Sequence, residues 1–250
     1  MERKNSEVHQ EIVRLNRYLA MAGVGSRRNN DKLILSGAVQ VNGHIVKDLG
    51  IRVNAQKDSV VVNGQQVSLE DKSVYILFNK PKDAITTLSD EKGRTTVMNY
   101  VRVKQRVFPV GRLDRNTTGV LLLTNDGDLA HALMHPKYEI EKVYRVTLDR
   151  QVTEEDLKKL RKGIMLEDGI SQAMVAEIIK GSKRKKVLLT LKEGKNKEVR
   201  RMFEALNYDV RQLDRISFAG LTPLGLPRGA WRLLNRNEVN YLKKITGILN

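Results

Sequence analysis

The sequence predicts an α+β protein with a small first domain and a larger second domain, and three observations support this prediction. With 250 residues, the chain is long enough for two modest domains that each bury a hydrophobic core. Its first part combines short helical patterns with hairpin signals. From residue 74 onward, apolar strand patterns are mixed with helical ones. The predicted division is therefore a domain at 1–68, a linker at 69–73 and a domain at 74–250.

The first domain opens with two predicted helices. Residues 11–26 carry apolar side chains at helical spacing and end in glycines at 23 and 25. The apolar positions are Ile12, Leu15 and Leu19. A second helix is predicted from Ser26, which is a favourable N-cap residue, to Gly37.

Two predicted hairpins complete the first domain. Residues 38–46 and 59–68 each place an Asn-Gly pair between β-branched residues. The pairs are Asn42 with Gly43 and Asn63 with Gly64. Tight hairpin turns need positive φ at both central positions, which Asn and Gly adopt readily, so each pair predicts a turn between two short strands.

The second domain mixes buried strands with helices. Strands are predicted at 74–79 and 119–124, and helices at 125–136, 153–163 and 197–208. In the second of these helices, Thr153 and Asp156 have capping-box spacing. In the third, the apolar face comprises Val199, Met202, Phe203 and Leu206. Arg200 and Arg201 lie off this face.

Charge is the strongest feature of the composition. The chain has 45 Lys and Arg against 29 Asp and Glu, which gives a net charge of +16 and a pI near 10.0. Residues 73–250 hold 34 of the basic and 21 of the acidic side chains. A polyanion such as nucleic acid is the predicted partner, and a merely soluble basic protein is the alternative.

Several classes of protein are not supported by the sequence. It contains no cysteine, no apolar run of about 18 residues and no secretory signal, so we expect a cytoplasmic protein without membrane contact. It also lacks a P-loop, and the segment 23–28 lacks the third glycine of a dinucleotide fingerprint, so no cofactor is predicted. His131 and His135 stand four residues apart, but a helix face is favoured over a metal site, and no metal is predicted.

The segment 111–119, GRLDRNTTG, is the main candidate for chemistry. Asp114 stands between Arg112 and Arg115, which favours its ionised form, and an ionised carboxylate can act as a nucleophile or a base. A structural salt bridge is the alternative. Glycines at both ends suit an unusual loop conformation, and the apolar strand that follows provides a rigid support.

This segment resembles the nucleophile loop of pseudouridine synthases. The resemblance continues, in order, through residues 78–83, 141–148, 191–208 and 225–234. It is strongest to the RsuA-type ribosomal RNA pseudouridine synthase family, in particular its large-subunit synthase B branch, and the first 70 residues resemble an S4-like RNA-binding domain. The resemblance implies a catalytic domain on a mixed, mainly antiparallel sheet with flanking helices. It also implies isomerisation of a specific uridine in ribosomal RNA, with the 23S RNA of the large subunit as the expected substrate.

The resemblance also assigns roles to individual residues. Asp114 corresponds to the nucleophile, and Tyr144 to the tyrosine that packs against the base and is proposed to help remove its C5 proton. Arg200 matches the basic residue that pairs with the aspartate, and Arg115 the residue that takes the place of the flipped base. The expected substrate contacts are Arg112, Arg115, Lys80, Lys197 and Met202, of which Met202 would form a wall against the uracil.

Other basic residues are candidates for RNA binding. Nine Lys or Arg residues and two Glu lie between Lys183 and Arg201. A solvated face is the ordinary explanation, but in an RNA enzyme such a run suits phosphate contacts. The candidates are Lys183, Arg184, Lys185, Lys186 and Arg201, together with Arg27 and Arg28 in the first domain.

Departures from the family pattern leave alternatives open. Asp83 stands where glycine is usual, and Asn29 and Asn30 stand where an acidic residue and alanine are usual. The second hypothesis is a non-catalytic RNA-binding or ribosome-assembly factor with the same fold, and a weaker third is an RNA hydrolase or deaminase. The expected partner is ribosomal RNA or a ribosome assembly intermediate, and the expected state is a monomer.

Overall fold

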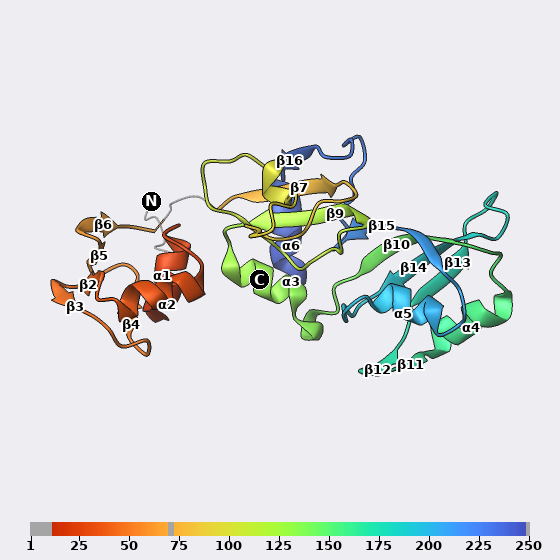
Figure 1. Ribbon diagram of the computed structural model, residues 1–250, viewed down its shortest axis with the longest axis horizontal. Coiled ribbons are helices and arrows are strands. Elements are labelled where there is room, and N and C mark those ends of the chain that lie inside the picture. The colour runs from red at the N-terminus through yellow and green to blue at the C-terminus, as the bar shows by residue number, and fades with distance from the viewer. Residues whose placement is uncertain (1–11, 70–72, 249–250) are drawn as a thin grey trace, which may run out of the picture. The chain divides into compact units, whose positions relative to one another are not determined.

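The computed structural model describes residues 12–69 and 73–248 (Figure 1). The chain divides into two compact units, the first ending at Ser73 and the second beginning at Val74, and each is treated by itself. The predicted linker at 69–73 falls largely on residues 70–72, which lie outside the described residues.

The first unit contains two helices, α1 (Leu15–Met21) and α2 (Arg27–Leu35). Ser26 caps α2 as predicted, because its hydroxyl group accepts the backbone N–H of Asn29 at 3.1 Å. The prediction that helix α1 includes Ile12 is wrong. Ile12 lies in strand β1 (Ile12–Arg14), which pairs with β4 (Arg52–Asn54), and its side chain is 59% exposed.

Both Asn-Gly hairpins are confirmed. The strands β2 (Val39–Val41), β3 (His44–Ile45), β5 (Val60–Val62) and β6 (Gln65–Val67) form one sheet in the order β3-β2-β5-β6. Asn42 and Asn63 have φ values of 51° and 49°, as the tight turns require. One face of this sheet packs with both helices around buried side chains such as Leu15, Leu19 and Ile34.

The second unit is built on a mixed, mainly antiparallel sheet. Seven strands follow the order β13-β14-β10-β15-β9-β7-β16, and β8 pairs with β9 beside them. The strands are β7 (Tyr75–Lys80), β8 (Phe108–Pro109), β9 (Thr117–Thr124), β10 (Lys142–Leu148), β13 (Val175–Ile178), β14 (Lys186–Leu191), β15 (Val210–Phe218) and β16 (Trp231–Leu233). A separate ribbon pairs β11 (Ile164–Leu166) with β12 (Gly169–Ser171). Within the described part of the chain, β9 and β15 form the single parallel pair of strands.

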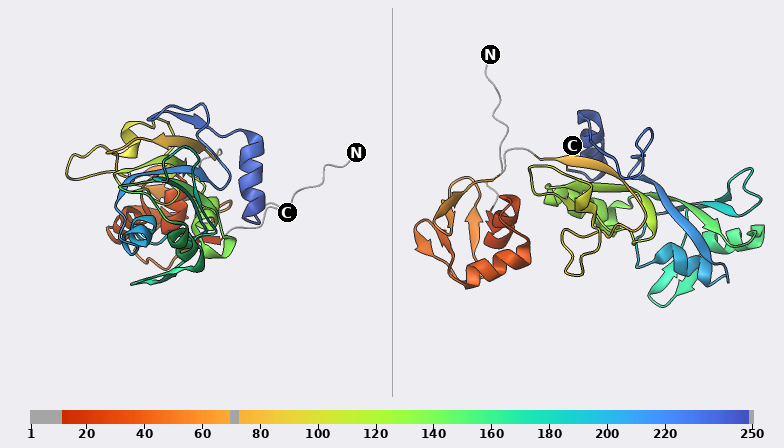
Figure 2. Two further views of the ribbon diagram at one scale, coloured as in Figure 1. Left: turned by 90° about the vertical axis from the view of Figure 1, so that its right-hand side faces the viewer. Right: turned by 45° about the horizontal axis from the view of Figure 1, so that its top comes forward.

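Helices cover the sheet in two groups (Figures 1 and 2). The helices α3 (Gly127–Met134) and α6 (Arg236–Ile245) pack with β7 and β9, whereas α4 (Glu154–Lys162) and α5 (Glu198–Glu204) pack with β10, β13, β14 and β15. Two short 3-10 turns lie at Val97–Asn99 and Pro136–Tyr138. The three helices predicted for this unit are confirmed. No helix among the described residues has the length and apolar character needed to cross a membrane.

Candidate active site

A cleft of about 700 Å³ opens in the second unit. Its walls come from the loop 86–88, from the segment 109–117, from Tyr144 on β10 and from the residues 194–199 that lead into α5. Asp114 lies within the second of these walls. The structure therefore brings two of the residues predicted to be catalytic, Asp114 and Tyr144, to one cleft.

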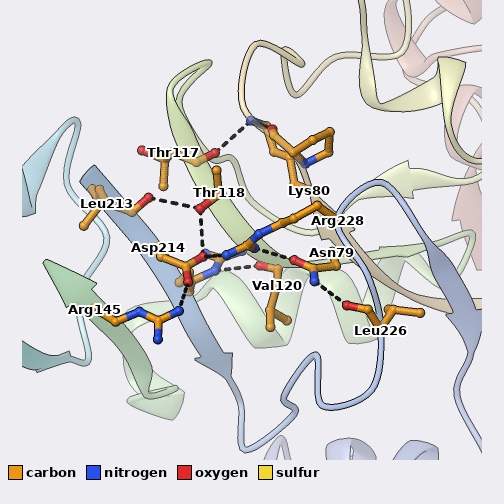
Figure 3. Close-up of polar contacts among 12 residues, drawn as sticks. Asn79, Lys80, Thr117, Thr118, Val120, Arg145, Leu213, Asp214, Leu226 and Arg228 are labelled. Atoms are coloured by element: carbon orange, nitrogen blue, oxygen red, sulfur yellow. Dashed lines mark hydrogen bonds and ion pairs between the residues drawn. The ribbon is translucent and has the colours of Figure 1, made fainter. Parts of the chain in front are cut away.

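The side chain of Lys80 supports the loop that carries Asp114. The Lys80 ammonium group donates to the backbone carbonyl oxygens of Pro81, Asp114, Arg115 and Thr117, at distances between 2.9 and 3.2 Å. Figure 3 shows the bond to Thr117. Lys80 is 0% exposed, so the predicted substrate contact of this residue is wrong, and its role is to support the loop. Burial lowers the pKa of Lys80 to about 8, although the charges of Asp114 and Asp83 act in the opposite direction.

Further contacts fix the same loop at both ends. The Thr86 hydroxyl group donates to the carbonyl oxygen of Leu113 at 2.7 Å, and the Leu113 side chain is buried. Where the loop joins β9, a Cβ atom on Gly119 would lie 2.1 Å from the Arg215 carbonyl oxygen, so only glycine fits. The position of the Asp114 backbone is therefore determined by several independent contacts.

The geometry of Asp83 accounts for its departure from the family pattern. Its φ of 67° lies in the left-handed region, which glycine adopts easily and Asp tolerates. Its backbone N–H donates to the carbonyl oxygen of Arg115 at 2.9 Å, and its carboxylate pairs with Nε of Arg115 at 3.1 Å. Arg115 is thus held beside Asp83 at the surface and does not line the cleft.

Two carboxylates line the cleft, and their surroundings differ. Glu198 is 4% exposed, and its oxygens accept the Ser171 hydroxyl group and, at 3.0 Å, the Lys195 backbone N–H. The carboxylate of Asp114 forms no ion pair or hydrogen bond with any side chain in the described ranges 12–69 and 73–248. Asp114 is therefore the carboxylate of this cleft that is available for chemistry.

A second polar network lies behind the cleft wall, around Asp214 on β15 (Figure 3). Its carboxylate accepts Nη2 of Arg145 at 2.8 Å, Nη2 of Arg228 at 2.5 Å and the Thr118 hydroxyl group at 2.8 Å. Burial alone would raise the pKa of Asp214, but these three hydrogen bonds together hold the pKa below its ordinary value. Arg228 also donates to Asn79, the neighbour of Lys80.

The other predicted substrate residues divide into two groups. Arg112 and Lys197 line the cleft, and Lys197 adopts a positive φ of 48° just before α5. Met202 does not form a wall of the cleft, because it is fully buried in the core on the inner face of α5. Arg200 lies outside the lining, and its Nη1 donates to the carbonyl oxygen of Val210 at 2.9 Å. The expected pairing of Arg200 with Asp114 is absent from the described structure.

The predicted RNA-binding residues belong to both units. Arg27 and Arg28 are exposed in the first turn of α2. Residues 183–185 lie in the turn before β14, and Lys186 is the first residue of that strand. In this turn the Arg184 side chain donates to the Val152 carbonyl oxygen and the Lys185 side chain to the Asp149 carbonyl oxygen. Arg201 is held by Asp168 through two hydrogen bonds of 2.9 and 2.8 Å.

Several lining residues escaped the sequence analysis. They include Thr86, Thr87, Leu88, Pro109, Met134, Leu191, Gly194, Lys195, Asn196, Glu198, Val199 and Leu213. Most are apolar or small, so nothing in their chemistry distinguishes them from ordinary core and loop residues. The buried Arg215, the cross-strand partner of Tyr144, was also missed, although an arginine inside an apolar strand pattern is a usable signal.

No metal-ligating group of three or more side chains occurs among the residues that the structure describes. The rings of His131 and His135 lie 5.5 Å apart, on and just after α3. The His135 ring accepts the backbone N–H of Lys137, which is a structural contact at the end of the helix.

Comparison with known proteins assigns the class of this fold and cleft. Residues 74–205 match the RNA pseudouridylate synthase family, and residues 13–60 match the S4 domain. The first match covers more than half of the chain, so the chain belongs to the RNA pseudouridylate synthase family. It is a pseudouridine synthase with an N-terminal S4 domain, as the sequence motifs predicted.

Individual relatives match along nearly the whole chain. The ribosomal large subunit pseudouridine synthase B of Bacillus subtilis is 43% identical over 236 residues, which cover 93% of this chain and 96% of the relative. An uncharacterized RNA pseudouridine synthase of Aquifex aeolicus is 41% identical over 94% of this chain and 96% of its own length. A crystal structure of a pseudouridylate synthase matches with a TM-score of 0.67 and 30% identity, over 92% of this chain and 99% of that one.

Proposed function

We propose that this enzyme isomerises a specific uridine of large-subunit ribosomal RNA to pseudouridine, with Asp114 as the nucleophile. The relatives named as ribosomal large subunit synthases support this substrate, since the Bacillus subtilis protein is 43% identical to the chain. The net charge of +16 and the S4 domain support binding to RNA. The observation that carries the proposal is the Asp114 carboxylate, which has no side-chain partner among the described residues and lies in the same cleft as Tyr144.

The proposed reaction needs little from the protein besides these two groups. The N1–C1′ bond of uridine breaks, the uracil rotates, and a C5–C1′ bond forms, while C5 loses a proton and N1 gains one. Asp114 acts either by attack at C1′ or by promoting elimination to a glycal, and Tyr144 packs against the base and helps remove the C5 proton. The rigid loop around Asp114 supports this role, because a fixed nucleophile needs no reorganisation during the reaction.

The target nucleotide must leave its stack before it reaches the cleft. Unstacking costs on the order of a few kcal/mol, which contacts to the rest of the RNA offset. Arg115 is the residue proposed to occupy the vacated position, and its exposed side chain next to Asp114 is consistent with that role. Arg27, Arg28 and the run 183–186 are proposed to bind phosphates, and the monomer is proposed to act on free RNA or on an assembly intermediate.

The test uses RNA with tritium at C5 of uridine, because formation of pseudouridine releases this tritium. We expect Asp114→Asn to lower the single-turnover rate by more than about a thousandfold, while the fold and the RNA affinity stay close to wild type. Asp209→Asn makes the same chemical change at an exposed ion pair and should leave the rate unchanged. A rate for Asp114→Asn within about tenfold of wild type, or 1.4 kcal/mol in the barrier, would contradict the proposal.

The substrate is identified by a second measurement. Pseudouridines are mapped in ribosomal RNA from cells with and without the gene, and the expected result is the loss of one position in the large-subunit RNA. Reconstitution with free RNA and with assembly particles then distinguishes the two substrates. RNA binding without tritium release from any ribosomal RNA would instead support a non-catalytic assembly factor.

A further inference from the structure

A tight turn at residues 195–198 forms one wall of the cleft. The turn closes on itself through two hydrogen bonds. The Glu198 carboxylate accepts the backbone N–H of Lys195 at 3.0 Å, and the backbone N–H of Glu198 donates to the Lys195 carbonyl oxygen at 3.3 Å. Asn196 and Lys197 lie at the tip of the turn, where both are exposed and line the cleft. The turn therefore presents an amide group and a cation to a substrate in the cleft.

The backbone of Lys197 has an uncommon conformation. Its φ of 48° and ψ of 28° lie in the left-handed region, which residues with a bulky side chain rarely adopt. Such conformations persist only where the surrounding contacts determine them, and they cluster at functional sites. The contacts of the residues next to Lys197 should therefore show what holds it.

The side chain of Glu198 anchors the turn. It is 4% exposed, and it forms no ion pair among the residues that the structure describes. A buried carboxylate needs hydrogen-bond donors, and each oxygen of Glu198 has one. Oε2 accepts from Lys195 within the turn, and Oε1 accepts the hydroxyl group of the fully buried Ser171 on β12. Glu198 thus ties the turn to the ribbon of β11 and β12.

The two lysines of the turn differ in their availability. Nζ of Lys195 donates to the Ile170 carbonyl oxygen at 2.6 Å and pairs with Glu193 at 3.2 Å, so this cation is occupied and adds a second tie to the ribbon. The side chain of Lys197 forms no hydrogen bond or ion pair with any residue at 12–69 or 73–248. Lys197 is therefore the cation of this wall that is free to contact the substrate.

We propose that Glu198 is a positioning residue of the active site, which holds Lys197 in the orientation that contacts the RNA backbone at the target nucleotide. This inference rests on the proposed function. Both oxygens of Glu198 are occupied, so it acts through the turn and not on the substrate itself. Its loss should slow the chemical step and leave most of the RNA affinity intact, because phosphate contacts outside the cleft remain.

The test compares two substitutions of Glu198 in the full-length enzyme. Glu198→Gln can keep both hydrogen bonds, since its amide oxygen accepts from Lys195 and its amino group donates to the Ser171 oxygen. Glu198→Met has a similar length and removes both. The substrate is a saturating transcript of large-subunit ribosomal RNA with tritium at C5 of uridine. We expect a single-turnover rate within about threefold of wild type for Glu198→Gln, and a rate about 10-fold to 100-fold lower for Glu198→Met.

A control and a double-mutant cycle show whether the effect passes through Lys197. Glu204→Gln makes the same chemical change at an exposed position of α5 and should leave the rate unchanged. In the Lys197→Met background, Glu198→Met should lower the rate by less than about a further twofold. Ser171→Ala removes one of the two anchoring bonds and should lower the rate by about threefold to tenfold, again only where Lys197 is present. If Glu198→Met does not fold, the Ser171→Ala cycle decides.

A second readout reports on the turn without RNA. The chain has no cysteine, so a nitroxide attached to Lys197→Cys is the single label on the protein. Its electron paramagnetic resonance spectrum measures the mobility of the label. Glu198→Met should increase this mobility, whereas Glu198→Gln should leave the spectrum close to that of the protein with Glu198.

The outcomes decide the inference. An equal loss of rate in Glu198→Gln and Glu198→Met would overturn it, because the charge of the carboxylate would then matter and not its hydrogen bonds. An equal loss in both backgrounds, full activity of Lys197→Met, or an unchanged label spectrum in Glu198→Met would also overturn it. A failure of the proposed function is recognised separately, because wild-type enzyme would then release no tritium from ribosomal RNA. In that case the label spectra still decide whether Glu198 holds the turn.

Discussion

The charged side chain of Lys80 is fully buried, and its hydrogen-bond partners explain how the protein tolerates a charge there. The ammonium group donates to the carbonyl oxygens of Asp114, Arg115 and Thr117. Two of these carbonyl groups also accept backbone N–H groups, since Asp114 accepts from Thr117 at 3.0 Å and Arg115 from Asp83 at 2.9 Å. The carbonyl oxygens stabilise the buried ammonium group, although burial still lowers the pKa of Lys80 to about 8.

We predict a pH dependence of stability from this residue. The folded state binds the Lys80 proton with a pKa of about 8, against 10.5 for the ordinary side chain. Between these values the unfolded state holds more protons, so the free energy of unfolding should rise with pH through that window. Lys142, whose pKa is lowered to about 8 by burial and by the Arg215 charge, contributes with the same sign. Urea unfolding at several pH values between 8 and 10 measures this rise.

Substitution identifies the contribution of Lys80. Lys80→Met should reduce the rise of the free energy of unfolding with pH. It should also lower the single-turnover rate at saturating RNA and pH 7.5 by about tenfold or more, because the Asp114 loop loses its support. Lys142→Met is the matched control. It should reduce the rise of the free energy of unfolding with pH to a similar degree and lower the single-turnover rate less. Equal pH dependence in wild type and in Lys80→Met would show that another group titrates.

At the residue scale, the sequence motifs predicted which residues lie near the cleft better than they predicted the contacts of each residue. Asp114, Tyr144, Arg112 and Lys197 meet in one cleft, as the resemblance implied. Met202 was misplaced because helical spacing identifies an apolar face without showing whether it borders a cavity or a core. The role of Lys80 depends on its burial, which the sequence around a charged residue does not reveal.

At the element scale, the short parallel pairing of β9 with β15 holds the active site together. It pairs Leu213 with Thr117, Asp214 with Thr118 and Arg215 with Gly119. These pairs differ in what they contribute. Leu213 and Thr117 line the cleft, and Gly119 permits the close approach of β15. Asp214 and Thr118 join the two strands through their side chains at 2.8 Å (Figure 3).

We predict that Asp214→Asn destabilises the second unit by about 2 kcal/mol. The change removes the charge that Arg145 and Arg228 share, and hydrogen bonds to charged groups contribute roughly 1.5–3 kcal/mol each when they are partly buried. Both arginines are partly exposed, so water compensates some of the loss. Urea unfolding monitored by the single Trp231 measures the difference.

Asp209→Asn is the control for this prediction, because it removes an exposed ion pair with Arg211 and should change stability by less than about 0.5 kcal/mol. The saturated rate of Asp214→Asn should also fall, since β9 carries the strand end next to Asp114. A variant as stable as wild type would mean that Asp214 does not join the two strands.

Elements were predictable where local chemistry determines them. The Asn-Gly turns, the Ser26 cap and the Thr153 cap each depend on a few neighbouring residues, and all three kinds of signal are confirmed. The parallel pairing of β9 with β15 was not predictable, because it joins segments almost a hundred residues apart. Ile12 was assigned to a helix because a three-residue edge strand carries no periodicity of its own.

At the scale of the whole molecule, the chain consists of two compact units. The first ends at Ser73 and contains the S4 match, and the second contains the cleft with Asp114. Each unit has its own hydrophobic core, so each satisfies the ordinary condition for independent folding. Both carry basic side chains, but the cleft is lined by the second unit alone.

We therefore predict that a chain of residues 74–250 folds and retains the chemical step while it binds RNA less tightly. Its binding to long ribosomal RNA fragments should weaken by at least about tenfold, or 1.4 kcal/mol, because the phosphate contacts of the first unit are gone. The dependence of affinity on salt should flatten by about 0.7 to 0.9 in log-log slope for each phosphate group that is no longer bound. The single-turnover rate at saturation should stay within about threefold of wild type, since every residue that lines the cleft is present.

The matched control for this fragment is the full chain with Arg27→Gln and Arg28→Gln. It keeps the S4 fold, because both side chains are exposed, and it should reproduce part of the flattened salt dependence. Salt titrations of binding and single-turnover kinetics on the same RNA compare the two proteins. Unchanged affinity of the folded fragment would show that the first unit does not bind this RNA, and a fall in its saturated rate would show that the first unit takes part in the chemical step.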